Sequence, residues 1–326
     1  MLPPLVFSPF ARPQVWGGRL LADRLNKSLP AGVFGESWEL SDHPLHVSRV
    51  KSGPLAGVSL HELWETRRKE LVGDQSVWQQ RRVPGDRFPL LIKFLDCHEL
   101  LSVQVHPSDA LAAQWAPQEA GKTEAWVVLD ASPKGRIYGG FRAGVTPAEL
   151  ERRLDDGTVA ECLHEIIPQV GGVYFLPAGT IHAVGGGVLM AEVQQNSDAT
   201  FRLFDWNRLG LDGRPRELHR EASLACIDWT QGPLSAARPQ LVESAGSPYE
   251  SLVKCPFFEL QRVRLNGKSP NADIGRLSIW MLVSGTATLC SGSERHALVS
   301  GDTLVLPAET EENHWQASDA VFLKAL

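Results

Sequence analysis

The sequence has few cysteines, no long apolar run and no cluster of positive charge. Its five cysteines are odd in number and show no Cys-x-x-Cys spacing, so neither a disulfide framework nor a thiolate zinc site is indicated. No segment reaches the ~18 consecutive apolar residues of a transmembrane helix. The start, MLPPLVFSPF, lacks the basic region of a signal peptide. We therefore expect a cytoplasmic protein with reduced, mostly buried thiols.

The charge balance argues against nucleic acid and membrane partners. The chain has 38 acidic and 32 basic residues, a net charge of -6. Its nearest basic cluster, Arg67-Arg68-Lys69, falls in a predicted helix and is interpreted as a solvated face. The run Gly185-Gly186-Gly187 is not followed by the Lys-Ser/Thr of a phosphate-binding loop. We expect a small-molecule ligand, and an anionic one would need a local cluster of cations.

Glycine and proline are frequent and predict a mainly β fold with a few helices. The 29 glycines and 22 prolines separate short apolar runs, which is typical of strands joined by turns. Apolar spacing and capping residues predict helical segments in the N-terminal part, the last of them broken near Gly157. These segments cover about 59–85, 107–117 and 146–165.

The C-terminal part repeats a pattern found earlier in the chain. Residues 171–184 and 300–315 both read as small turn residues, an apolar strand, Leu-Pro-Ala and a downstream His. Composition shifts to Gly, Pro, Ser and Ala within 232–248. We therefore expect a first unit of residues 1–240, which the family resemblance described below implies to be the catalytic one, and a degenerate, metal-free β unit of residues 241–326.

Four polar residues form a candidate metal site. In an extended strand Ser102, Gln104 and His106 point to one side while the alternating apolar residues point to the other. Buried polar groups need partners, and a divalent ion satisfies an amide oxygen, an imidazole and a carboxylate together. The predicted ligands are Gln104, His106, Glu124 and His182. The other eight histidines have no comparable setting and are interpreted as surface or structural residues.

Several segments resemble the short bacterial form of the type I phosphomannose isomerases, which are also called mannose-6-phosphate isomerases. QVHP followed by KTE and then PAGTIHA is a specific combination, and further matches extend over about two thirds of the chain. The matching segments are GESWELS (35–41), PLLIKFLD (89–96), LSVQVHP (101–107), GKTE (121–124), LPAGTIHA (176–183) and NSDATFRLFDWNR (196–208).

The resemblance implies two cupin-type jelly-roll barrels, one catalytic and one not. It implies one Zn²⁺ per chain at the four positions above, and interconversion of mannose 6-phosphate and fructose 6-phosphate through a cis-enediol. We expect a monomer or weak homodimer. One departure is clear: longer members have His-Lys-Pro-Glu where this chain has Gly121-Lys122-Thr123-Glu124.

Three residues are candidates for catalysis. Strand alternation directs Glu192 into a partly apolar lumen, where we expect its carboxyl to have a raised pKa. By the resemblance, Glu192 matches a family carboxylate near the substrate. Arg202 lies among aromatic and apolar residues; the resemblance puts it at the substrate, and a salt bridge to Asp198 or Asp205 is the alternative. Lys122 shares a strand face with Glu124 and is a candidate for ring opening or phosphate binding.

Substrate binding is assigned to Lys122, Arg202 and two further residues. Ser102 precedes Gln104 on the metal face and offers a hydroxyl to a phosphate oxygen. Lys93 stands within an apolar strand, so it either reaches the site or extends outward to solvent. Two other functions stay open at this point: an Fe(II)-dependent cupin oxygenase, which uses a similar ligand set, and a non-catalytic sugar-binding cupin.

Overall fold

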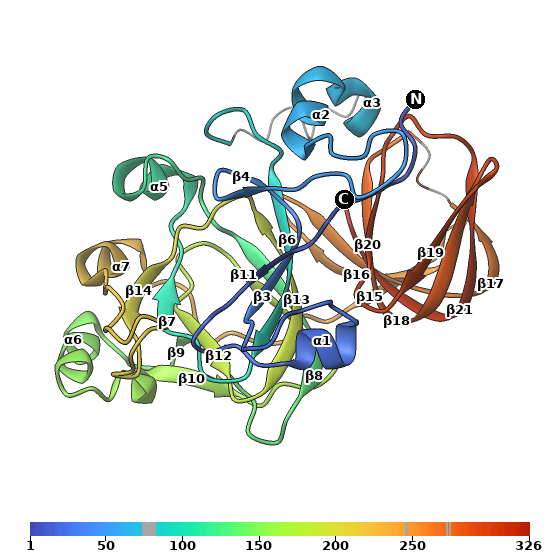
Figure 1. Cartoon of the computed structure of the whole chain (residues 1–326). Helices are drawn as coiled ribbons and strands as arrows, with labels where there is room; N and C mark the ends of the chain where they lie inside the picture. Colours follow the sequence, from blue (N-terminus) through green and yellow to red (C-terminus); the bar gives the residue numbers. More distant parts are fainter. Residues whose placement is uncertain (74–82, 245–246, 272, 274) are drawn as a thin grey trace.

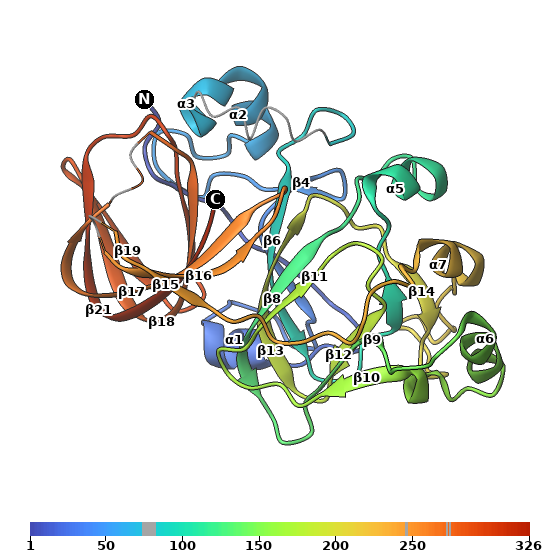
Figure 2. The ribbon, with the colours of Figure 1, turned by 180° about the vertical axis from the view of Figure 1, so that it is seen from behind.

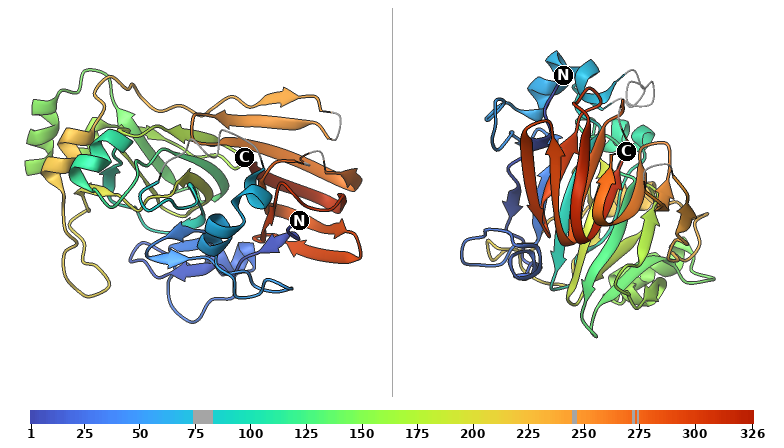
Figure 3. Two further views of the ribbon diagram at one scale, coloured as in Figure 1. Left: turned by 90° about the horizontal axis from the view of Figure 1, so that it is seen from above. Right: turned by 90° about the vertical axis from the view of Figure 1, so that its right-hand side faces the viewer.

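The computed structural model is mainly β and describes residues 1–73, 83–244, 247–271, 273 and 275–326. All strand pairings named here are antiparallel. Figure 1 shows the last strands, drawn in orange to red, on one side of the molecule, and the helices α5, α6 and α7 at the opposite end. The view from above in Figure 3 shows the same separation along the long axis.

Two sheets form the part of the molecule that contains most of the predicted site residues. The six-stranded sheet has the order β11-β8-β13-β6-β3-β2 and the five-stranded sheet the order β10-β9-β12-β7-β14. Figure 2 shows β8, β11 and β13 of the first sheet from behind. The strands of the first are β2 (Phe10–Arg12), β3 (Glu36–Leu40), β6 (Leu90–Cys97), β8 (Glu124–Ala131), β11 (Val173–Leu176) and β13 (Val188–Gln195). The strands of the second are β7 (Val103–Val105), β9 (Arg136–Phe141), β10 (Leu163–Ile166), β12 (His182–Gly185) and β14 (Phe201–Phe204).

A third, eight-stranded sheet consists mostly of C-terminal residues. Its order is β1-β20-β18-β21-β17-β16-β15, with β19 paired to β18. The short N-terminal strand β1 belongs to it, although the sequence predicted residues 1–240 as a separate unit. The predicted division at residue 240 stays a prediction. The strands are β1 (Leu5–Val6), β15 (Gln240–Val242), β16 (Tyr249–Lys254), β17 (Glu259–Pro270), β18 (Ser278–Ser291), β19 (Glu294–Val299), β20 (Thr303–Leu306) and β21 (Asn313–Ala325). A small hairpin pairs β4 (Asp42–His43) with β5 (His46–Val47).

The helices agree with the predicted capping residues, with one correction. Ser59 and Ser108 accept backbone N–H groups at the starts of their helices, as expected for Ser N-caps. The second half of the segment 146–165 is not a helix: Val159–Cys162 is a single 3₁₀ turn, and the chain continues as β10 because it pairs with β9. The helices are α1 (Leu20–Leu25), α2 (Leu60–Thr66), α3 (Arg68–Val72), α5 (Asp109–Trp115), α6 (Pro147–Asp155) and α7 (Arg220–Cys226). Residues 74–82 of the predicted segment 59–85 lie outside the described residues.

Strand β6 is buried on both faces, which explains its continuous apolar run. Leu90, Ile92 and Phe94 belong to a core cluster shared with strands of the eight-stranded sheet. Residues two apart point the same way, so the opposite face of β6 carries Lys93 and Leu95 toward the five-stranded sheet. A lysine on this inward face has only 3% exposure. It therefore needs a partner inside the molecule.

Candidate active site

The register of the five-stranded sheet sets three predicted residues side by side. His182 on β12 is directly opposite Gln104 on β7, and Gln104 is in turn opposite Arg202 on β14. His106 follows β7 by one residue. Its carbonyl accepts the backbone N–H of Gly179 at 2.8 Å, so the turn before β12 is attached to the end of β7. Gly179 has φ +89°, a left-handed conformation that favours glycine at this turn.

The six-stranded sheet supplies the acidic residues. Glu192 on β13 is directly opposite Lys93 on β6 and Trp126 on β8. Glu124 begins β8, two residues before Trp126, and therefore lies on the same face. The two sheets thus bring two carboxylates toward the histidines of the five-stranded sheet.

His106, Glu124 and His182 converge, as the sequence predicted. One potential ligand atom from each lies within 4.8 Å of the others, and all three side chains are buried. The two oxygens of Glu124 are each 3.5 Å from an imidazole Nε2, one from His106 and the other from His182. In the described part of the chain Oε1 has no hydrogen-bond partner, and Oε2 has Lys122 Nζ at 3.0 Å. A buried carboxylate with an oxygen that lacks a hydrogen-bond partner is suited to bind a cation.

The two imidazoles are oriented by the backbone. Nδ1 of His106 donates to the carbonyl of Ala199 and Nδ1 of His182 to that of Thr180, both at 2.8 Å. Each Nε2 therefore keeps its lone pair toward Glu124, the arrangement in which histidine binds a metal. Burial lowers the pKa of His182 to about 4 and that of His106 well below its ordinary value. Both rings are neutral at physiological pH, as ligands must be.

Gln104 adjoins this triad. Its Nε2 lies 3.2 Å from Nε2 of His182, and its Oε1 accepts the hydroxyl of Ser102 at 3.0 Å. The amide nitrogen and oxygen are nearly equal in shape, and rotating the amide by 180° would direct the oxygen toward the triad. Ser102 would then accept a hydrogen bond from the amide instead of donating one.

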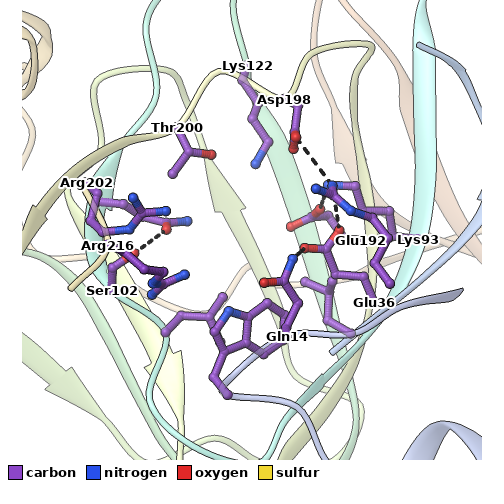
Figure 4. A pocket seen from close by; sticks show the side chains of 15 residues that line it. Gln14, Glu36, Lys93, Ser102, Lys122, Glu192, Asp198, Thr200, Arg202 and Arg216 are labelled. Carbon is purple, nitrogen blue, oxygen red and sulfur yellow. Dashed lines mark hydrogen bonds and ion pairs between the residues drawn. The ribbon is translucent and has the colours of Figure 1, made fainter. Parts of the chain in front are cut away.

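A cavity of about 310 Å³ adjoins the predicted ligands and is lined by Gln104 and by every predicted catalytic or substrate-binding residue. In Figure 4, Arg202 and Arg216 lie on one side of it, Lys93, Glu36 and Glu192 on the other, with Lys122 pointing inward between them. The lining residues are Arg12, Gln14, Trp16, Glu36, Lys93, Leu95, Leu101, Ser102, Gln104, Lys122, Glu192, Asp198, Thr200, Arg202 and Arg216.

Lys93 reaches the cavity and does not extend outward to solvent. Its Nζ is 3.3 Å from Oε1 of Glu192 and 5.2 Å from the centre of the Trp38 ring. Lys122 Nζ lies 3.1 Å from Nε2 of His106. Burial acts to lower the pKa of Lys122, but the carboxylates of Glu124 and Glu192 outweigh burial and raise it. Lys122 is therefore a buried, charged ammonium beside the candidate metal ligands.

The expectation of a raised pKa for Glu192 is wrong. Burial acts in that direction, but Lys93 and Lys122 outweigh it, and the indole N–H of Trp126 donates to Oε2 at 2.9 Å. The pKa of Glu192 is lowered. The sequence suggested an apolar lumen because the neighbours of Glu192 along β13 are apolar. The two lysines come from β6 and from the residues just before β8.

Arg202 has neither of the salt bridges considered as its alternative. Asp198 pairs with Arg12, and Asp205 pairs with Arg208 and Arg216. Nη1 of Arg202 donates to the carbonyl of Glu217 at 2.7 Å, and its buried Nε has no hydrogen-bond partner in the described part of the chain. Burial and the neighbouring Arg216 lower the pKa of Arg202. Among the described residues this guanidinium, which lines the cavity, has no paired carboxylate.

The prediction missed part of the cavity wall. Gln14 donates to Glu36 Oε1 at 2.9 Å, and Arg12 lies 3.5 Å from Glu36 Oε2 and 3.3 Å from Asp198. The alternation of Arg12 and Gln14 along the chain is a signal that could have identified this wall. Arg216 has no comparable signal, because it reaches the cavity through its ion pair with Asp205.

Comparison with known proteins decides the family. A family model described as the catalytic domain of type I phosphomannose isomerase matches residues 6–126. The mannose-6-phosphate isomerase of Bacillus subtilis is 34% identical over 305 residues, which cover 93% of each chain. The mannose-6-phosphate isomerase of Streptococcus mutans is 34% identical over 307 residues, 94% of this chain and 93% of the relative. The chain belongs to the type I phosphomannose isomerase family. The resemblance read from the sequence is thereby confirmed.

A solved structure supports the same conclusion for the fold. The crystal structure of the mannose 6-phosphate isomerase from Bacillus subtilis is 31% identical, with a TM-score of 0.90 over the full length of both chains. The prediction of a mainly β, cupin-type fold is confirmed. No helix in the described part of the chain is long and apolar enough to cross a membrane.

Proposed function

We propose that this chain is a zinc-dependent aldose-ketose isomerase that interconverts mannose 6-phosphate and fructose 6-phosphate through a cis-enediol. The observation that carries the proposal is the convergence of two neutral imidazoles and a buried carboxylate beside a cavity rich in cations. Family membership supports the substrate class, because the relatives bear the name of this activity.

One zinc ion per chain would be held by Gln104, His106, Glu124 and His182. Nitrogen and oxygen donors in this number suit zinc. When bound, the ion supplies positive charge that polarises the sugar carbonyl and stabilises negative charge developing on the C1 and C2 oxygens.

Glu192 is the proposed base. Its lowered pKa keeps it ionised, and it lines the cavity from the strand next to β8. In the aldose-to-ketose direction its carboxylate takes the proton from C2 of the open-chain sugar and returns a proton to C1, while the hydroxyl proton of O2 is lost and O1 gains one. Trp126 and Lys93 hold the two oxygens of Glu192 in place. A positioned base contributes ~10²- to 10⁴-fold to the rate.

Lys122 and Arg202, with Ser102 and Lys93, are the proposed groups for substrate binding. Arg202 presents a guanidinium that pairs with no carboxylate in the described part of the chain, which suits a phosphate or the oxygens of the reacting carbons. Lys122 lies next to Glu124 and His106, so it is placed to assist ring opening or to bind the anion. Two acidic residues of the cavity wall, Glu36 and Asp198, are paired with Arg12, so they do not neutralise Arg202.

The two alternatives receive less support. Family membership argues against an Fe(II)-dependent oxygenase. A non-catalytic sugar-binding cupin would require Glu192 and Arg202 to point away from the cavity, whereas both line it.

A coupled assay of the purified protein with mannose 6-phosphate tests the proposal. We expect activity that is lost on chelation and restored by zinc. Absence of activity with the metal-loaded protein would contradict the proposed reaction, and full activity after complete removal of metal would contradict the role of zinc.

A further inference from the structure

A second cavity, of about 300 Å³, lies against the eight-stranded sheet, away from the candidate active site. Its lining includes Trp280 on β18 and Trp315 on β21, both part of a separate core cluster. Neighbouring residues on these strands, such as Ile279 and Leu323, pack instead into the core shared with the six-stranded sheet. The cavity therefore lies on the opposite face of the sheet from that shared core.

A buried lysine stands where an apolar residue is expected. Ala320 and Phe322 on β21 belong to the core cluster of this face, and the alternation of the strand puts Lys324 on the same side. Lys324 is directly opposite Trp280 and only 6% exposed. Its Nζ lies 5.2 Å from the centre of the Trp280 ring and 5.5 Å from that of Tyr249. An ammonium in this position is costly to bury without a partner.

The charges lining the cavity do not balance. Lys324 Nζ donates to Oδ2 of Asp273 at 2.8 Å, and Arg276 lies 3.0 Å from Oδ1 of the same residue. Two cations and one carboxylate among the described lining residues leave a net charge of +1. Burial lowers the pKa of Lys324, and the carboxylates of Asp273 and Glu259 offset this only in part. An added anion would reduce the cost of holding two cations together.

One aromatic residue of the lining also has an unused hydrogen-bond donor. Trp315 is 1% exposed, and within the described residues its indole Nε1 has no hydrogen-bond partner. Buried indole N–H groups normally find an acceptor. The lining thus combines aromatic surface, a free donor and excess positive charge.

From this geometry we infer a second ligand site, between Lys324, Arg276 and Trp315, for a small hydroxylated anion whose charged group is a phosphate ester or a carboxylate. Arg276 and Lys324 bind the charged group, Trp315 donates to an oxygen, and the aromatic rings pack against the carbon skeleton. The cavity volume is at the lower end of the range of small-molecule sites. No residue of this site belongs to the candidate active site.

The test is the binding stoichiometry of the full, metal-loaded chain by calorimetry, with fructose 6-phosphate, gluconate and neutral mannose as probes. Lys324→Met and Arg276→Ala remove one cation each, and Trp315→Phe removes the donor while keeping an aromatic ring. Lys254→Met is the matched control, because Lys254 is on the same sheet with its side chain 79% exposed.

We expect the unmodified chain and Lys254→Met to bind one equivalent more of fructose 6-phosphate or gluconate than the three cavity variants do. If a variant still binds at the second site, its affinity there should be at least tenfold weaker than that of the unmodified chain. Isomerase activity should be unchanged in all of them, so failure here is separate from failure of the proposed reaction. Two results would overturn the inference: the same stoichiometry in every protein, or mannose binding as tightly as the anions. If Lys324→Met does not fold, Arg276→Ala decides, because that side chain is 36% exposed.

Discussion

Lys93 and Glu192 are directly opposite each other on β6 and β13, and 3.3 Å separates their Nζ and Oε1 atoms. Trp126, opposite Glu192 on the other side, donates to the second oxygen. Burial alone would favour the protonated carboxyl, but this lysine and Lys122 reverse the effect. The pair therefore supplies an ionised carboxylate in a closed environment, which is the form that a base requires.

Glu192→Gln should retain the fold and the metal but lose activity. The amide keeps the shape of the side chain and removes the group that accepts the proton. We expect kcat to fall by ~10²- to 10⁴-fold, with metal content and thermal midpoint near those of the unmodified protein. Activity within a few fold of the original would transfer the role of base to another group, with Lys122 next in line.

Lys93→Met should shift the pH profile of kcat/KM. The cation lowers the pKa of Glu192, so removing it raises that pKa, and the acid limb of the profile should move to higher pH. Lys27→Met is the matched control: Lys27 is also buried and pairs with Glu39 at 2.7 Å, but it does not line the active-site cavity. An identical acid limb in Lys93→Met and the unmodified protein would show that this lysine does not control the base.

His106→Ala and His182→Ala should each abolish metal binding, whereas Gln104→Ala should have a milder effect. Each histidine substitution removes one of the two imidazoles whose Nε2 atoms face Glu124. The amide of Gln104 is the weakest of the four predicted ligands. Elemental analysis of the dialysed proteins measures this. His61→Ala serves as the control, since His61 pairs with Asp42 outside the cluster. Full metal occupancy in either of the first two variants would disprove the ligand assignment.

Arg202→Ala should discriminate between phosphorylated and free sugar. If its guanidinium binds the phosphate, loss of a charge-assisted hydrogen bond worth about 1.5–3 kcal/mol should lower kcat/KM at least tenfold for mannose 6-phosphate and hardly at all for mannose. Equal losses of kcat for both sugars would instead place Arg202 at the reacting carbons.

If Lys122 binds the phosphate, Lys122→Ala should likewise lower kcat/KM for mannose 6-phosphate much more than for mannose. Because Lys122 Nζ is 3.0 Å from Glu124 and 3.1 Å from His106, the metal content of this variant must be measured in parallel. A loss of activity that follows the loss of metal would argue for a role in supporting the ligands. Retained metal with equal losses on both sugars would exclude phosphate binding by this residue.

Local sequence patterns determined the half of the site that contains the candidate metal ligands. Alternation puts Ser102, Gln104 and His106 on one face of a strand regardless of what surrounds it, because the side-chain period of an extended chain is two. The Pro-Ala-Gly turn before His182 needs a left-handed residue and has Gly179 there. The capping serines at 59 and 108 likewise act within one turn of their helices. Such features depend on near neighbours and can be predicted from sequence.

Only the tertiary structure decided the electrostatics. The pKa of Glu192 depends on Lys93, nearly a hundred positions earlier in the chain, through a strand pairing that sequence periodicity does not specify. The same is true of Arg202, which pairs with neither of the two carboxylates considered as its alternative partners, since Arg12, Arg208 and Arg216 pair with them. Pairing with β9 in the five-stranded sheet also made the end of the segment 146–165 a strand. Charge interactions fall off with distance in space, so the strand register, which sequence alone left open, determined them.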